Sequence, residues 1–132
     1  MDQNINIKIE ALTDAEPYKI ANKIISILDD KKAADIKLLY VEKQTILADY
    51  FIICSGGSST QIKALAGYVE ENMKLCGLAP KNTDGYSGAT WVVMDYGSVI
   101  LHIFNRETRN FYNLEKLWKD ASEIEISSIN KS

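Results

Sequence analysis

The sequence is short of the side chains that build metal sites and disulfide frameworks. It holds two cysteines and one histidine in 132 residues. Cys54 and Cys76 each lie inside an apolar stretch, and His102 has no second histidine to join it. Structural zinc sites use four closely spaced Cys or His ligands. We therefore expect no metal ion and no disulfide, but two buried thiols in a reducing compartment.

Long apolar runs and a basic surplus are also missing. The longest apolar runs, such as residues 50–54, are far shorter than the roughly 20 residues of a membrane span. Residues 1–12 alternate isoleucines with polar residues and contain no apolar block of a secretory signal. The formal net charge is −3, whereas affinity for nucleic acid comes largely from Lys and Arg. We expect a cytoplasmic protein with no membrane association, little direct nucleic-acid binding, and protein partners that include basic ones.

What the chain does have is enough apolar sequence for one folded domain. Hydrophobic residues make up 46% of the chain and charged residues 25%, and a chain of this length buries about two-thirds of its unfolded surface. No internal repeat or linker divides it. We predict a single domain over residues 13–121, with an N-terminal extension at 1–12 and a C-terminal tail at 122–132.

The first half of the domain shows the pattern of one helix and two strands. Thr13 and Glu16 have the spacing of a capping box, and Pro17 suits a first helical turn, after which apolar residues follow a helical stripe. Residues 36–41 are mostly apolar and β-branched or aromatic, which is typical of a strand. The continuous apolar run at 50–54 predicts a strand covered on both faces.

The second half begins with another helix. Ser58 and Gln61 are again spaced as a capping box, and Gly77 lies where a left-handed residue would end the helix. Residues 80–90 are rich in turn-forming residues and predict a loop.

The chain then continues with a predicted hairpin and a last helix. Residues 91–94 and 98–104 predict two strands joined by a turn, and residues 111–118 predict a helix. The apolar residues placed on one face of that helix are Phe111, Leu114, Leu117 and Trp118. The resulting order α, β, β, α, β, β, α predicts an α/β (α+β) fold, in which helices flank a mixed sheet.

A glycine-rich segment at residues 55–59 lies between a predicted strand and a predicted helix, where backbone N–H groups could hold a phosphate. It matches neither of the two common phosphate-binding fingerprints. Nucleotidyltransferases place alternating carboxylates on the strand after such a turn to hold two metal ions. Here the corresponding acidic residues, Glu70 and Glu71, are adjacent and within a helix. We expect no metal site and no catalytic residue.

The most informative cluster is aromatic. Trp91 and Tyr96 lie in the predicted hairpin, Tyr86 precedes it, and residues 82–105 carry no positive charge. Such a surface lacks phosphate contacts but suits a protein interface, where Trp and Tyr are common anchors. The alternative, in which Trp91 and Tyr96 simply pack against the last helix, stays open. For His102, which has no adjacent partner for acid–base work, a structural or interface role is favoured.

Three blocks of this sequence resemble one known family. They are ADYFIICSGGSS at residues 48–59, WVVMDYGSVILHIF at 91–104, and RNFYNLEKLW at 109–118. Their order and spacing are similar to those of the ribosomal silencing factor family, the bacterial relatives of plant Iojap. One departure is Asp84 before Gly85, where the family usually has Glu-Gly.

The resemblance implies a nucleotidyltransferase-like fold without the catalytic carboxylates, and no enzyme activity. It implies binding to the large ribosomal subunit through its intersubunit-face protein number fourteen. The bound factor sterically blocks association with the small subunit and so represses translation under nutrient limitation. A role in ribosome biogenesis and a homodimer of the free protein are left open. The alternatives are a nucleotidyltransferase-like enzyme and a ribosome-assembly factor that binds RNA.

The hairpin and its surroundings are the expected partner-binding surface, with no cofactor or metal. Its expected central residues are Trp91, Asp95, Tyr96 and His102. Its expected flanking residues are Tyr86, Arg106, Arg109 and Tyr112.

Overall fold

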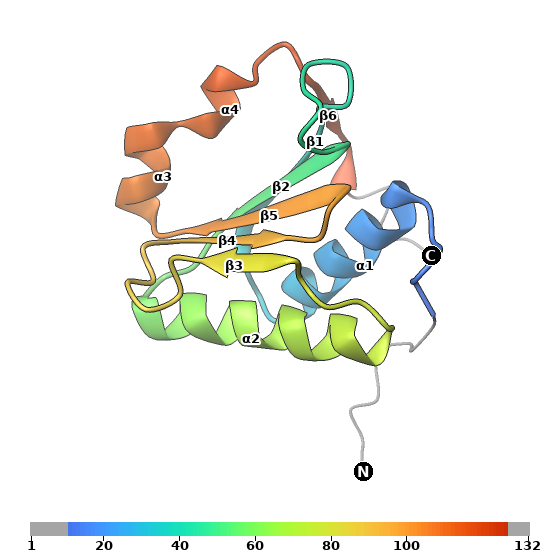
Figure 1. The fold of residues 1–132 in the computed structure, drawn as a ribbon. Helices are drawn as coiled ribbons and strands as arrows, with labels where there is room; N and C mark the ends of the chain where they lie inside the picture. Colours follow the sequence, from blue (N-terminus) through green and yellow to red (C-terminus); the bar gives the residue numbers. More distant parts are fainter. Residues whose placement is uncertain (1–10, 127–132) are drawn as a thin grey trace.

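The computed structural model describes residues 11–126, which form a six-stranded mixed sheet with helices on both sides (Figure 1). The strands are β1 (Ala34–Tyr40), β2 (Tyr50–Ser55), β3 (Asn82–Asp84), β4 (Trp91–Asp95), β5 (Val99–Phe104) and β6 (Ser122–Ile124). Their order across the sheet is β3-β4-β5-β2-β1-β6. β2 and β5 run parallel, and the other neighbours are antiparallel. The predicted fold class is confirmed.

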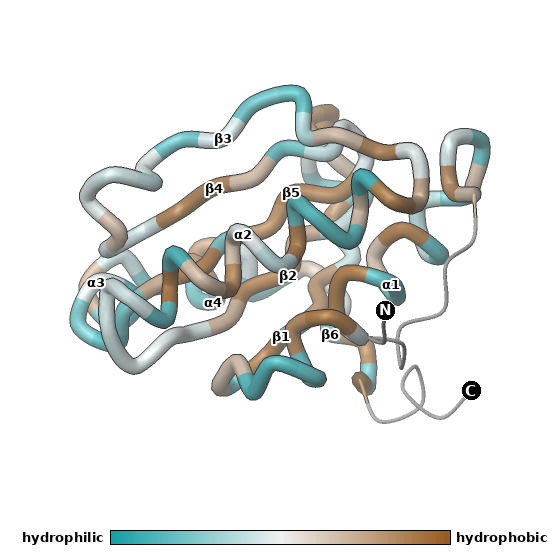
Figure 2. The backbone as a smooth tube through the Cα atoms, turned by 90° about the horizontal axis from the view of Figure 1, so that it is seen from below, coloured by the Kyte–Doolittle hydropathy of each residue, from teal (hydrophilic) through white to brown (hydrophobic). Residues whose placement is uncertain are grey.

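Two long helices, α1 (Pro17–Asp30) and α2 (Ser59–Leu75), cover one face of the sheet, which we call the helix-side face (Figure 1). Their apolar stripes pack against one side of the central strands, which are mostly brown in the hydropathy view of Figure 2. The fully buried residues here include Ile24, Ile25, Leu38, Ile52, Val69, Met94 and Leu101. None of the helices within residues 11–126 is both long and apolar enough to cross a membrane.

The start of α1 differs from the prediction. Glu16 itself is the N-cap residue, in an extended conformation, and its side chain makes no capping hydrogen bond. A residue before proline is disfavoured in the helical region, so Pro17 fixes the first helical position and leaves Glu16 outside the helix. The capping box expected between Thr13 and Glu16 is therefore wrong, whereas the role of Pro17 is confirmed.

Both ends of α2 agree with the prediction. The Ser58 hydroxyl accepts a hydrogen bond from the Gln61 N–H at 3.0 Å, and the Gln61 side chain accepts one from the Gly57 N–H. Gly77 has φ +88°, which lets the Leu78 N–H donate back to the Met73 carbonyl at 2.9 Å.

The predicted hairpin of β4 and β5 is confirmed. Gly97 has φ +88° at the turn, where glycine adopts this backbone conformation at no steric cost. The Asp95 carboxylate accepts a hydrogen bond from the Gly97 N–H at 2.7 Å. The sequence did not predict β3, which lies inside the loop expected at 80–90 and pairs with β4.

The single helix predicted at 111–118 is wrong. The structure has two short helices, α3 (Arg106–Tyr112) and α4 (Leu114–Leu117), separated by Asn113 in a left-handed conformation with φ 52°. Asparagine tolerates this region better than most residues. Asn105 caps the start of α3, because its side chain accepts a hydrogen bond from the Thr108 N–H at 2.8 Å.

The break at Asn113 also changes which side chains are buried. Phe111 and Leu117 are 80% and 72% exposed, whereas Leu114 is 9% exposed. The apolar face predicted for one continuous helix is therefore split between solvent and core.

The second face of the sheet, which we call the aromatic face, is only partly covered by α3 and α4 (Figure 1). The core beneath these helices contains Leu39, Val41, Ala48, Phe51, Ile53, Phe104 and Leu114, with Trp91, Ile100, Trp118 and Ala121 at its margin. Elements outside residues 13–121 also join the fold. β6 pairs with β1 at the sheet edge, and Leu12 is 1% exposed.

Candidate functional site

A row of partly buried side chains lies on the aromatic face, on the part of the sheet that carries β4 and β5. Alternate residues of β4 point to opposite faces, so Trp91, Val93 and Asp95 lie on the aromatic face while Val92 and Met94 are buried against the helices. Ile100 of β5 pairs with Asp95 and shares this face. We call Trp91, Val93, Asp95 and Ile100 the β4 strip.

Aromatic contacts hold the Trp91 end of the strip in place. The Trp91 ring stacks on Phe104 with centroids 4.9 Å apart and meets Tyr112 of α3 at 4.8 Å. Tyr112 is itself 49% exposed. The structure therefore places the partly buried Trp91 against the more exposed Tyr112, two of the residues expected in the partner-binding surface.

His102 lies beside the strip and is 8% exposed. The Trp91 indole N–H donates a hydrogen bond to His102 Nδ1 at 3.1 Å, and Phe51 meets the imidazole edge-to-face at 5.2 Å. Burial lowers the pKa of His102 to about 4, because the charged imidazolium loses its hydration. The side chain is therefore neutral at pH 7 and can accept the hydrogen bond from Trp91.

Arg109, expected at the edge of the partner surface, is buried at 8% exposure. Its guanidinium donates two hydrogen bonds to one Glu115 carboxylate oxygen, at 3.0 and 2.8 Å, and a third to the Ser55 hydroxyl at 2.7 Å. These bonds tie α3, α4 and the end of β2 together. Arg109 thus positions the two short helices on the aromatic face.

Tyr96, expected as a central anchor, lies away from the strip. It follows Asp95, so its side chain takes the opposite face of the sheet and is 6% exposed in the helix-side core. Burial raises the pKa of Tyr96 above its ordinary value. Trp91 and Tyr96, which the sequence predicts in one partner-binding surface, therefore lie on opposite faces of the sheet.

The two remaining expected residues are exposed and lie at the end of the sheet where β4 begins. Tyr86 is 48% exposed in the loop between β3 and β4, and the Lys63 ammonium of α2 lies 5.8 Å from the centre of its ring. Gly85 has φ +83°, and a Cβ there would collide with the Trp91 carbonyl, so this loop lies close against β4. Arg106 begins α3 and is exposed.

Sequence reasoning missed several exposed apolar side chains around the aromatic face. The sequence predicts Phe111 and Leu117 on one face of a continuous helix, and the left-handed Asn113 interrupts that helix. In the loop between β1 and β2, Ile46 and Leu47 are fully exposed and 67% exposed.

The glycine-rich turn at 55–59 uses its amide groups within the chain. The Gly56 N–H donates to the Phe104 carbonyl at 2.9 Å, and the Gly57 N–H donates to the Gln61 side chain. Glu70 and Glu71 lie exposed on α2. Within the described range, 11–126, no group of three or more His, Cys, Asp or Glu side chains is arranged to hold a metal ion.

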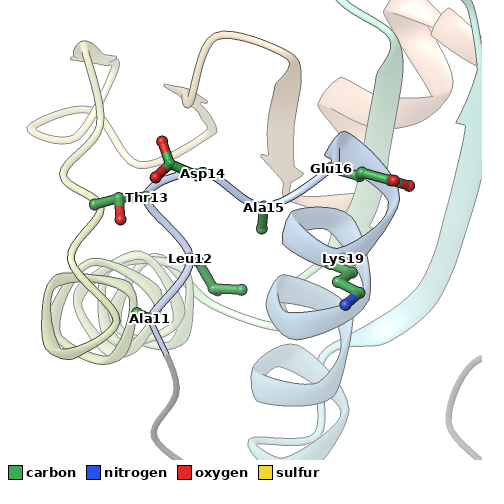
Figure 3. Close-up of a pocket in the computed structure, with 7 residues that line it drawn as sticks. All are labelled: Ala11, Leu12, Thr13, Asp14, Ala15, Glu16 and Lys19. Carbon is green, nitrogen blue, oxygen red and sulfur yellow. The ribbon is translucent and has the colours of Figure 1, made fainter.

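Two hollows away from the strip are lined mainly by polar residues. One, of about 480 Å³, lies where β2 ends, and its charges pair internally, as between Lys37 and Glu123 at 3.5 Å. The other, of about 470 Å³, lies between residues 11–16 and α1 (Figure 3). Its apolar member Leu12 points toward α1 (Figure 3) and is buried. Neither hollow contains an aromatic side chain.

The fold and this surface together define a class: a small mixed α/β protein with one face of its sheet closed by helices and a partly open aromatic strip on the other. A sequence model of the family described as "Ribosomal silencing factor during starvation" matches residues 14–132. The chain belongs to the ribosomal silencing factor family.

Individual relatives agree with this assignment. The chain is 43% identical over 93 residues to the ribosomal silencing factor RsfS of Bacillus subtilis, covering 70% of this chain and 79% of the relative. It is 37% identical over 105 residues to RsfS of Halalkalibacterium halodurans, covering 80% and 90%. A crystal structure of a protein from Chromobacterium violaceum superposes with a TM-score of 0.77 at 34% identity, covering 79% of this chain and 87% of that one.

Proposed function

We propose that this protein binds the large ribosomal subunit through its intersubunit-face protein number fourteen and sterically blocks association with the small subunit. Translation is thereby repressed when nutrients are limiting. The proposal rests on family membership, and the β4 strip is the observation that supplies its contact surface.

The strip has the composition of a protein-binding anchor. Trp91, Val93 and Ile100 are partly buried apolar side chains in one row, and the neighbouring Tyr112 extends this row onto α3. Binding energy in interfaces is concentrated in a few such aromatic and aliphatic side chains that become fully desolvated. A rigid sheet supports the strip, so little side-chain freedom is lost on binding.

The charges around the strip favour a basic protein partner over exposed RNA phosphate. Asp95 belongs to the strip, and Asp84 on β3 pairs with Val93 and lies on the same face. Residues 82–105 contain no Lys or Arg. Carboxylates near an apolar surface repel phosphate and attract Lys and Arg side chains, which sets the partner and the orientation of docking.

Co-sedimentation with separated ribosomal subunits, followed by a subunit-joining assay, tests the proposal. We expect the parent chain to travel with the large subunit and to reduce joined ribosomes in proportion to its occupancy. Val93→Lys places a charge at the centre of the strip and should abolish both effects. Leu75→Lys, at a 58% exposed site on α2, is the matched control and should behave as the parent. Equal binding by the two variants would place the interface elsewhere, and no binding by the parent would refute the function.

A further inference from the structure

His102 carries one N–H group that is paired with nothing among the described residues. An indole N–H can only donate, so His102 Nδ1, which accepts from Trp91, must hold a lone pair. A neutral imidazole has one proton, which is therefore on Nε2. That nitrogen is buried and has no hydrogen-bond partner within residues 11–126.

The surroundings of this N–H explain why it lacks an acceptor. In the sheet, His102 stands between Val93 of β4 and Ile53 of β2, and its ring contacts those of Phe51 and Phe104. All four neighbours are apolar. Nε2 is also the ring nitrogen farther from the backbone of β5, and it is buried.

A buried donor without an acceptor costs folding free energy, and native proteins hold few of them. A leucine or phenylalanine at this position would fill the space without that cost, although it would also remove the acceptor of the Trp91 N–H. His102 is the direct cross-strand neighbour of Val93, at the centre of the β4 strip. The unsatisfied group therefore borders the surface on which the partner is proposed to dock.

We propose that His102 is a recognition residue whose Nε2–H donates a hydrogen bond to an uncharged oxygen of the protein partner, a backbone carbonyl or a side-chain amide. The inference rests on the function proposed above and adds the chemistry of one contact. An uncharged acceptor fits because the site is apolar and Asp84 and Asp95 stand nearby, so a buried carboxylate would be both desolvated and repelled.

Access to Nε2 requires a small movement, because only 8% of His102 is exposed in the free chain. Trp91, whose ring touches the imidazole, lies at the margin of the cover provided by α3 and α4, whereas Phe51 is buried in the core beneath them. Changes of side-chain rotamer at an interface are common on binding even where the backbone stays fixed. Docking is thus coupled to a rearrangement of the side chains that cover His102.

Two substitutions distinguish a role of His102 in partner recognition from a role in the stability of the fold. His102→Phe keeps a planar ring and removes the donor. His102→Gln keeps an acceptor for the Trp91 N–H and a donor near the place of Nε2. We expect His102→Phe to unfold at a temperature equal to or above that of the parent, yet to bind the large subunit about tenfold more weakly. His102→Gln should recover most of the affinity.

Tyr18→Phe serves as the control, because it removes one hydroxyl donor from a 43% exposed side chain of α1, away from the strip. It should lose less affinity than His102→Phe. In ¹⁵N spectra of the parent, the Nε2–H signal should shift downfield and exchange more slowly in the complex than in the free chain.

The outcomes distinguish a failure of the His102 contact from a failure of the proposed function. If the parent binds, Val93→Lys does not, and His102→Phe binds within twofold of the parent, the role of His102 is refuted while the interface stands. If His102→Phe does not fold, equal affinity of His102→Gln and parent, together with the Nε2–H shift, supports the proposal. A weakly binding but folded His102→Gln, or an unshifted signal, refutes it. If the parent does not bind the large subunit, both proposals fail.

Discussion

The two faces of the sheet are built from the same strands but in different ways. On the helix-side face, α1 and α2 bury a continuous aliphatic core whose members, such as Ile52 and Met94, are 0% exposed. On the aromatic face, two short helices cover only part of the sheet and leave Trp91, Val93 and Ile100 partly buried. The comparison shows that the helix-side face is covered throughout, whereas the aromatic face buries residues such as Ile53 and Phe104 under α3 and α4 and leaves part of β4 and β5 less covered, where we propose that a partner docks.

The largest expected effect is a difference in the free energy of unfolding between substitutions at two adjacent residues of β4. Met94→Ala, in the helix-side core, should lower the free energy of unfolding by about 4 kcal/mol, since it leaves a cavity that the packed helices cannot fill. Val93→Ala, one residue away on the aromatic face, should cost less than about 1 kcal/mol. Urea denaturation of both variants measures the difference. Similar losses would mean that the two faces contribute equally to stability.

The next largest effect is a pH dependence of the free energy of unfolding, which arises from His102 on the aromatic face. The pKa of His102 is about 4 in the folded chain and 6.5 as the ordinary value, so between these pH values the unfolded chain binds more protons than the folded one. The free energy of unfolding should therefore fall by about 3 kcal/mol as pH drops from 6.5 to 4. His102→Gln cannot titrate and should lack this component. Denaturation curves of parent and variant across that window make the test, and parallel pH profiles would contradict it.

A smaller effect is expected on binding, again with a matched pair. Tyr112→Ala removes a 49% exposed ring that packs on Trp91, and should weaken binding to the large subunit by about 2 kcal/mol, or roughly thirtyfold. Tyr18→Ala removes a 43% exposed ring from α1 and should leave affinity unchanged. Titration of labelled protein against large subunits compares the two. Equal losses of affinity in the two variants would mean that binding does not depend specifically on the aromatic face.

The smallest effect concerns the break between α3 and α4. Asn113 is left-handed, and Asn113→Ala should lower the free energy of unfolding by about 1 kcal/mol because alanine is strained there. Asn113→Gly relieves that strain and should be near the parent. Thermal unfolding distinguishes them, and an alanine variant as stable as the glycine variant would argue against the left-handed corner.

The parts of the fold that could be predicted from sequence are those set by local chemistry. Ser58, Gly77 and Gly97 each mark a helix end or turn by a side chain, or the lack of one, that the local backbone requires. The continuous apolar run of β2 likewise indicated a strand covered on both faces. Such signals act within a few residues, so a single sequence is enough to find them.

The remaining parts of the fold depend on strand pairing between segments distant in the chain, or on the backbone conformation of a single residue such as Asn113. β6 forms because it pairs with β1, which lies far away in sequence, and β3 is only three residues long. The candidate site was half predicted. Trp91 and Tyr112 do meet, but Tyr96 lies on the opposite face, because composition does not show on which side of the sheet a residue near a turn will point.

The parallel pairing of β2 with β5 has a consequence for how the protein is made. Synthesis runs from the N-terminus, and β2 cannot gain this central neighbour until residues up to Phe104 have been released. The aromatic face is completed later still, since Trp118 at the end of α4 packs on Phe51. A nascent chain therefore completes the proposed docking surface late, and a product cut short before α3 would carry both long helices without the part of that surface that α3 and α4 provide.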